Sequence, residues 1–208
     1  ERQVGRPREF LGQLPDPPSP KQVDQAIFRL LELGAVKKGS MGSMQLTCFG
    51  RFLQKMPLDP EVGCLVMNGV RYGIVDECAI IAGVTQRGEP FLELQDWTFE
   101  DAGKFWAVRN MCSQEPHLSV GNGIARYPSD LIAAMRAYQA WQQQRQKQGD
   151  DWTLDDEWQW CADHYLSLSR LHDIEEMTHQ IRDVLTDLRY CSKVSEVSKR
   201  RLRKRRRE

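Results

Sequence analysis

The sequence has 208 residues, 40% of them hydrophobic and 28% charged, which suffices for one large domain or two small ones with a hydrophobic core. No run of about 18 apolar residues occurs, which excludes a predicted membrane span, and the charged N-terminus lacks the apolar block of a signal peptide. Six cysteines lie singly, without metal-ligand spacing, so we expect a reducing, intracellular compartment and no zinc site.

The formal net charge is zero, but the basic residues are unevenly distributed. Eight of the 29 Lys and Arg lie in the C-terminal tail, which leaves 21 against 29 Asp and Glu in the whole chain. The mildly acidic body argues against broad nonspecific adhesion to nucleic acid. The tail is expected to be disordered in isolation, and it fits a nuclear localisation signal, an RNA-binding segment or a solvated linker. Its basic residues are Lys199, Arg200, Arg201, Arg203, Lys204, Arg205, Arg206 and Arg207.

The N-terminal quarter predicts a small domain with a short hairpin. Residues 1–18 are rich in proline and predict an extended strap. Ser19 as N-cap and Pro20 at the first helical position predict a helix, and Gly34 marks its end. Residues 35–47 offer two short extended pieces around a Gly/Ser turn.

A second short helix closes this domain. Thr47 can cap it, apolar residues recur at helical spacing over 49–56, and Pro57 ends it. The helix, hairpin and helix together suggest a winged-helix-like unit over 19–60. Such a unit can read DNA or can serve a structural or protein-docking role. Its helix faces lack the dense Arg, Lys and Asn set of a DNA-reading helix, which favours the structural or docking role.

The remaining core signals, over 61–190, are helical. We expect two helices over 62–85 with a break near Tyr72-Gly73, and further helices over 101–112, from Pro128 or Ser129 onward, and over 158–171 and 174–188. The acids Asp155, Asp156 and Glu157 are read as a solvated helix start. The fold class is therefore mainly α: a small unit with a β-hairpin followed by an all-helical bundle.

The chain carries no recognisable catalytic motif. It has no GxxxxGK[ST] loop, and Gly121-Asn122-Gly123 lacks the strand–helix context of a phosphate-binding loop, so we assign it to a turn. No DExH box or HExxH spacing appears, and the spacing of His172 and His179 does not support a metal site. We expect no catalytic residue, no metal and no cofactor in this segment.

A set of motifs in a fixed order resembles the C-terminal region of DEAH/RHA-type (DExH-box) ATP-dependent RNA helicases. The resemblance covers roughly residues 8–190 and rests on order and spacing. It is carried by Phe10-Leu11, Pro15–Pro18, Leu33–Ala35, Leu46-Thr47, Gly50–Leu53, Met56–Pro60, Ala79–Ala82, Glu89–Phe91, Ser129–Leu131, Ala137-Tyr138, Trp141, Trp160-Cys161 and Tyr165-Leu166.

This resemblance implies a winged-helix domain over 19–60 and a helical ratchet-like domain over 61–190, with 1–18 leading from a RecA-like lobe and 191–208 as a basic tail. In the family, RecA-like lobes bind ATP and Mg and drive translocation; their motifs are absent here. The ratchet-like domain closes one side of a channel for single-stranded RNA. An OB-fold usually follows in the family, but here the charged tail begins where it would start.

The resemblance also implies which residues face RNA: Ser129, Asp130, Tyr165, Ser167, Ser169 and Arg170. Ser129 and Asp130 match a helix-start motif, for which simple N-capping is an equal interpretation. Tyr165 fits a core position as well as a stacking platform, and Arg170 is the best phosphate candidate. Acidic neighbours on this helix, and Ser169 where the family often has Arg or Lys, predict weak RNA affinity for the isolated segment.

Two functions follow from different classes. The first is an accessory region of an RNA helicase, with single-stranded RNA, the RecA-like lobes and protein cofactors as partners, in the nucleus or another RNA-processing compartment. The second is a non-catalytic protein-interaction module with a helicase-derived fold, which the polar 139–156 stretch and the acidic faces favour.

Overall fold

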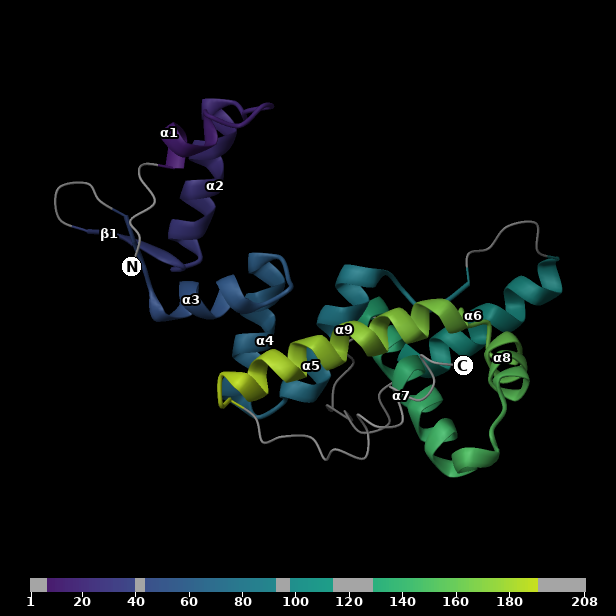
Figure 1. Cartoon of the computed structure of the whole chain (residues 1–208). Coiled ribbons are helices and arrows are strands. Elements are labelled where there is room, and N and C mark those ends of the chain that lie inside the picture. The colour runs from purple at the N-terminus through teal and green to yellow at the C-terminus, as the bar shows by residue number, and fades with distance from the viewer. Residues whose placement is uncertain (1–6, 40–43, 93–97, 114–128, 191–208) are drawn as a thin grey trace, which may run out of the picture. The chain divides into compact units, whose positions relative to one another are not determined.

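A computed structural model describes residues 7–39, 44–92, 98–113 and 129–190 (Figure 1). The chain divides into two compact units, Glu1–Cys64 and Leu65–Glu208, and the division falls within one helix. The fold is mainly helical with a small antiparallel sheet, which confirms the predicted fold class. Its elements in order are α1 (Pro7–Leu11), α2 (Pro20–Glu32), β1 (Val36–Lys38), β2 (Met44–Leu46), α3 (Cys48–Lys55), α4 (Pro60–Tyr72), α5 (Val75–Arg87), α6 (Phe99–Ser113), α7 (Asp130–Gln148), η2 (Gly149–Asp151), α8 (Leu154–Asp163) and α9 (Leu168–Asp187).

The first unit begins with two helices, of which the sequence predicted the second, α2, but not the first, α1. Ser19 caps α2 with a full capping box, in which its hydroxyl accepts from the Gln22 main chain and the Gln22 side chain accepts from the Ser19 main chain. The prediction of an extended strap over 1–18 is wrong for Pro7–Leu11, which form α1. Arg8 on α1 pairs with Asp24 on α2, and this tertiary contact lies outside what local proline content can predict.

The hairpin is joined to α3 by one threonine. Strands β1 and β2 pair antiparallel, with Val36 opposite Leu46. The Thr47 hydroxyl accepts from the Gly50 main chain at 2.9 Å, as predicted for an N-cap, and it lies 2.8 Å from the Gly34 carbonyl, to which it donates. One side chain therefore satisfies a free N–H of α3 and holds the chain that leaves α2.

The second unit is a helical bundle whose core is aromatic. Helix α5 packs against α7 and α9, and α6 packs against α7. Tyr138 and Trp141 on α7 are fully buried, with ring centroids 5.6 Å apart. Gly83 on α5 permits the close approach of α9, because a side chain there would meet the Thr178 hydroxyl at 3.1 Å and the Ile174 carbonyl at 3.2 Å.

A helix over 158–171, as the periodicity predicts, is wrong: α8 ends at Asp163 and α9 begins at Leu168. Tyr165 adopts a left-handed conformation with φ of 55°. The Leu166 N–H bonds the Cys161 carbonyl at 2.8 Å and the Tyr165 N–H bonds the Ala162 carbonyl at 3.1 Å, which is the hydrogen-bond pattern of a Schellman cap. The left-handed position usually holds glycine, so the sequence carries no obvious stop signal there.

Two acids of the second unit are buried, and one of them, Glu157, was expected in a solvated helix start. Asp156 caps α8 as expected, but Glu157 is fully buried and accepts a hydrogen bond from the Trp141 indole at 3.0 Å. Glu175 on α9 is 4% exposed and pairs with Arg145 on α7. A buried carboxylate is stable only when it is paired or hydrogen-bonded, and both partners come from α7.

Candidate nucleic-acid interface

Residues 88–92, which follow α5, lie at the centre of the candidate site. Gly88 ends α5 with φ of 94°, and Pro90 and Phe91 are buried behind it. The Ser167 N–H donates to the Pro90 carbonyl at 2.8 Å, and the Leu92 N–H donates to the Tyr165 carbonyl at 3.0 Å. This short antiparallel pairing fixes the loop after α5 against the connection between α8 and α9.

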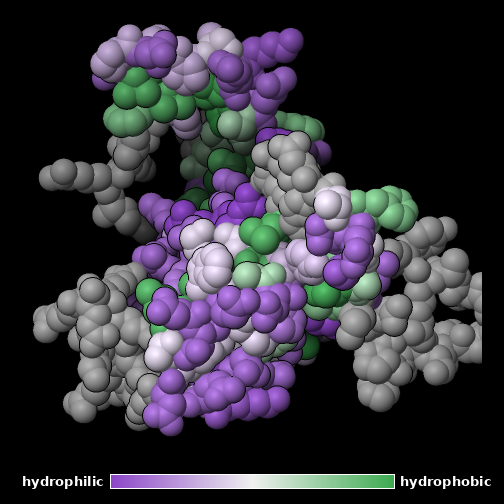
Figure 2. All heavy atoms as spheres, turned by 90° about the vertical axis from the view of Figure 1, so that its right-hand side faces the viewer, coloured by the Kyte–Doolittle hydropathy of each residue, from purple (hydrophilic) through white to green (hydrophobic). Residues whose placement is uncertain are grey.

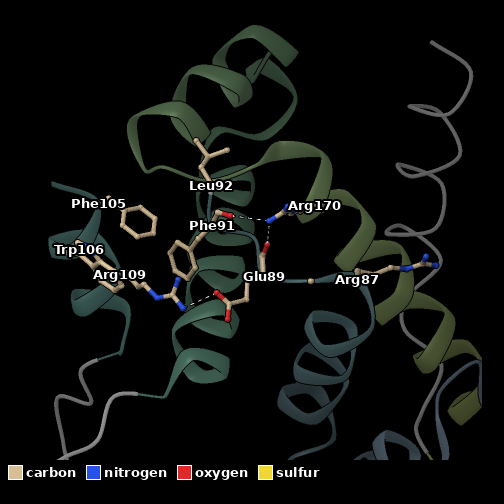
Figure 3. A pocket seen from close by; sticks show the side chains of 9 residues that line it. Arg87, Glu89, Phe91, Leu92, Phe105, Trp106, Arg109 and Arg170 are labelled. Carbon is tan, nitrogen blue, oxygen red and sulfur yellow. Dashed lines mark hydrogen bonds and ion pairs between the residues drawn. The ribbon is translucent and has the colours of Figure 1, made fainter. Parts of the chain in front are cut away.

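Arg170, in the first turn of α9, reinforces that pairing. Its guanidinium donates to the main-chain carbonyls of Glu89 at 3.2 Å and Phe91 at 3.3 Å (Figure 3). Ser167 caps α9 by accepting from the Arg170 main chain at 3.5 Å, and its hydroxyl lies 3.1 Å from that of Ser169. Arg170 therefore has a demonstrable positioning role, and its phosphate contact stays a prediction.

Arg109 on α6 contacts two carboxylates and an aromatic ring of the site. Its guanidinium lies 2.9 Å from a carboxylate oxygen of Glu89 and 2.9 Å from one of Asp130, and 5.0 Å from the Phe91 ring centroid. Burial by itself lowers the pKa of Arg109, but hydrogen bonding and charge attraction from Asp130 and Glu89 raise it above its ordinary value. The cation therefore stays charged and joins α6, α7 and the loop after α5.

These residues surround a pocket of about 480 Å³. Figure 3 shows the Arg109 guanidinium beside the rings of Phe91 and Trp106 at this pocket. Trp106 is 48% exposed, whereas Phe105 beside it is 3% exposed. The lining consists of Arg87, Gly88, Glu89, Phe91, Leu92, Phe105, Trp106, Arg109 and Arg170.

The structure brings most of the RNA-facing candidates to this loop. Asp130 holds Arg109, and the Tyr165 ring packs edge-on against Phe105 with centroids 6.1 Å apart. Ser129 caps α7 by accepting from the Ile132 N–H at 3.4 Å, which matches the capping interpretation. The eight basic residues of the tail, within 191–208, lie outside the described residues.

Sequence reasoning assigned no site role to Arg87, Glu89, Trp106 or Arg109. Trp106 and Arg109 are three residues apart on α6, a spacing that puts them on one helix face, and the guanidinium lies 5.7 Å from the Trp106 ring centroid. The spacing of Trp106 and Arg109 is the sequence signal that could have pointed to this site. Glu89, which pairs with Arg109, is 20 residues away in the sequence, so only the three-dimensional structure reveals this contact.

Two histidines of α9 lie near buried carboxylates. His172 lies 3.5 Å from Glu157, and His179 lies 4.0 Å from Glu175. Over the described ranges, no group of three or more His, Cys, Asp or Glu could hold a metal ion. No helix in these ranges is both long enough and apolar enough to cross a membrane.

Comparison with known proteins points to one class. No family model matches the chain. The chain is 29% identical over 187 residues to the mouse "ATP-dependent RNA helicase TDRD9" and 28% identical over 188 residues to the "Probable ATP-dependent RNA helicase spindle-E" of Aedes aegypti. It is 28% identical over 192 residues to the "DExH-box ATP-dependent RNA helicase DExH1" of Arabidopsis thaliana.

These matches cover 86%, 88% and 92% of this chain, but only 12%, 12% and 17% of the respective relatives. The chain thus spans a small part of their length, and the similarity extends through both structural units. Across most of its length, this chain is similar, at 25–29% identity, to proteins named as ATP-dependent helicases, among them DExH-box and DEAH-box enzymes.

Proposed function

We propose that this chain is the C-terminal accessory region of an ATP-dependent RNA helicase. It closes one side of a single-stranded RNA channel and supports translocation driven by RecA-like lobes, which bind ATP and Mg outside this sequence. The observation that carries the proposal is the similarity to RNA helicases over 86–92% of the chain.

The architecture is compatible with this role. Residues 19–60 supply the proposed winged-helix domain and 61–190 the proposed ratchet-like bundle. Within the bundle, Tyr165, Ser167 and Arg170 contact one loop, and Asp130 is linked to it through Arg109. Hydroxyls, amides and cations in one place can contact phosphate and sugar without choosing a sequence, as a translocating enzyme requires.

The test is to measure RNA-stimulated ATP hydrolysis and duplex unwinding by the longer protein encoded at this locus, with and without residues 8–190. We expect the deletion to lower both activities while basal ATP hydrolysis remains. A coding sequence without P-loop and DExH motifs, or ATP hydrolysis that RNA does not stimulate, would refute the proposal.

A second candidate, a protein-interaction module, rests on an apolar pocket of about 230 Å³ in the first unit. Leu46 lines it and is 42% exposed. Figure 2 shows a mixture of hydrophilic and hydrophobic residues on its visible face. The pocket is lined by Leu30, Ala35, Val36, Leu46, Gly50, Leu53, Gln54 and Pro60.

Leu46→Asp tests this second candidate. We expect it to abolish capture of a protein partner by the full chain, whereas Leu14→Asp, which alters a leucine of similar exposure outside the pocket, should leave capture intact. This function would be ruled out if neither the unaltered chain nor the Leu14→Asp variant retained a protein partner and RNA stimulated ATP hydrolysis by the longer protein.

A further inference from the structure

Trp106 is an aromatic ring that has two side-chain contacts and a large exposed surface. Its indole packs edge-on against the buried Phe105, with centroids 5.4 Å apart, and the Arg109 guanidinium lies 5.7 Å from its ring centroid. Even so, it is 48% exposed. Contacts that restrict a ring reduce the side-chain entropy lost when a planar ligand stacks on it, so Trp106 offers a stacking surface at the pocket.

The charges around the pocket favour an extended anionic ligand. The three lining arginines, Arg87, Arg109 and Arg170, outnumber the two carboxylates that Arg109 pairs with, those of Glu89 and Asp130. Arg87 at the end of α5 is exposed and forms no ion pair within the described part of the chain. Figure 3 shows the Arg87 guanidinium pointing away from the pocket, on the opposite side of Phe91 from Trp106. A ligand that contacts both must continue beyond the pocket.

We propose that this pocket is a stacking subsite for single-stranded RNA, an inference that rests on the proposed helicase function. One base stacks on the exposed surface of Trp106, and the sugar–phosphate backbone continues toward Arg87. Every base has a π face and every linkage has a phosphate, so the subsite grips the strand without reading its sequence.

The test compares two labelled oligomers of about 12 residues, a single-stranded RNA and a sugar–phosphate strand without bases. Fluorescence anisotropy measures their binding to the full chain, to Trp106→Ala, and to Trp158→Ala as a control. Trp158 on α8 is also a largely exposed indole, at 61%. We expect Trp106→Ala to weaken RNA binding by about 5- to 150-fold, whereas Trp158→Ala changes it less than about twofold.

The strand without bases separates stacking from structural damage. Wild type and Trp106→Ala should bind it equally, because only a base can stack. An equal loss for both strands, or no loss for RNA, would overturn the subsite. If circular dichroism shows that Trp106→Ala does not fold, Trp106→Leu keeps apolar packing against Phe105 without an aromatic face, and the same two outcomes apply.

Arg87→Ala tests whether the sugar–phosphate backbone continues from Trp106 to Arg87. It should reduce the slope of log affinity against log salt by about 0.7, the value for one phosphate on a single strand, while Arg71→Ala, an exposed arginine on α4, should leave the slope unchanged. Equal slopes for both variants would overturn the proposed path. RNA binding by the wild-type chain that does not depend on Trp106 defeats only the subsite, whereas ATP hydrolysis by the longer protein that RNA does not stimulate defeats the proposed function.

Discussion

The Arg170 guanidinium donates a hydrogen bond to the main-chain carbonyl of Glu89 at 3.2 Å, across 81 residues of sequence. A second bond reaches the Phe91 carbonyl. The arginine that sequence reasoning ranked first for phosphate is therefore engaged with the protein's own backbone. Its contribution to RNA affinity competes with this structural contact.

Deleting Lys199–Glu208 should weaken RNA binding more than Arg170→Ala does. The tail carries eight cations, so its removal should lower the salt slope by up to about 6, against less than about 1 for Arg170→Ala. Anisotropy titrations at several salt concentrations measure both. Equal affinity with and without the tail at low salt would contradict this prediction.

Arg109→Ala should destabilise the second unit by about 1–3 kcal/mol, because Glu89 and Asp130 lose their shared partner. Arg109→Lys keeps the charge but loses the planar fork, so we expect an intermediate effect. Urea unfolding followed by circular dichroism measures the changes. Arg71→Ala removes one exposed arginine and should cost less than about 0.5 kcal/mol; equal losses for both alanine variants would exclude a special role for Arg109.

Gly50→Ala should destabilise the first unit by about 1–3 kcal/mol or more. An added Cβ would lie 2.0 Å from the Ala35 carbonyl oxygen and 2.8 Å from a Leu46 methyl group, so the hairpin or α3 must shift. Gly103 on α6 is the matched control: nothing lies within 4 Å of its added Cβ, and Gly103→Ala should stabilise by about 0.5–1 kcal/mol. Amide hydrogen exchange, analysed separately for each unit, measures both changes in stability. If Gly50→Ala left the stability of the first unit unchanged, the hairpin and α3 could move apart without cost.

The pKa of His179 predicts how stability depends on pH. Burial lowers it below the ordinary value of 6.5, and Arg182 and Arg145 lower it further, against opposing effects of Glu175 and Asp183. The unfolded chain then binds a proton more readily than the folded chain, so the free energy of unfolding should fall as pH drops below about 6.5. His179→Gln should flatten this dependence between about pH 7.5 and 5; an unchanged slope in urea titrations would contradict the assignment.

Local chemistry accounts for the elements that sequence reasoning placed correctly. Ser19, Thr47 and Ser129 cap the helices that they were expected to cap, because an N-cap bond reaches only two or three residues along the chain. The break between α4 and α5 follows Tyr72 as predicted, with Gly73 in a left-handed conformation. Nearby side chains and glycine's freedom carry that information.

Tertiary structure decided the candidate site. The end of α8 depends on Tyr165 in a position that normally signals itself by glycine, and that connection pairs with the loop at Pro90. The buried Glu157 accepts a hydrogen bond from Trp141, 16 residues earlier, and Arg109 beside Trp106 is held by Glu89 and Asp130, which lie on other segments. The sequence by itself determined where the helices capped by Ser19, Thr47 and Ser129 start and which class of protein the chain resembles, because both are written in short-range patterns. Only the packed bundle decided which charged and aromatic side chains meet, because their partners come from helices that are distant in sequence.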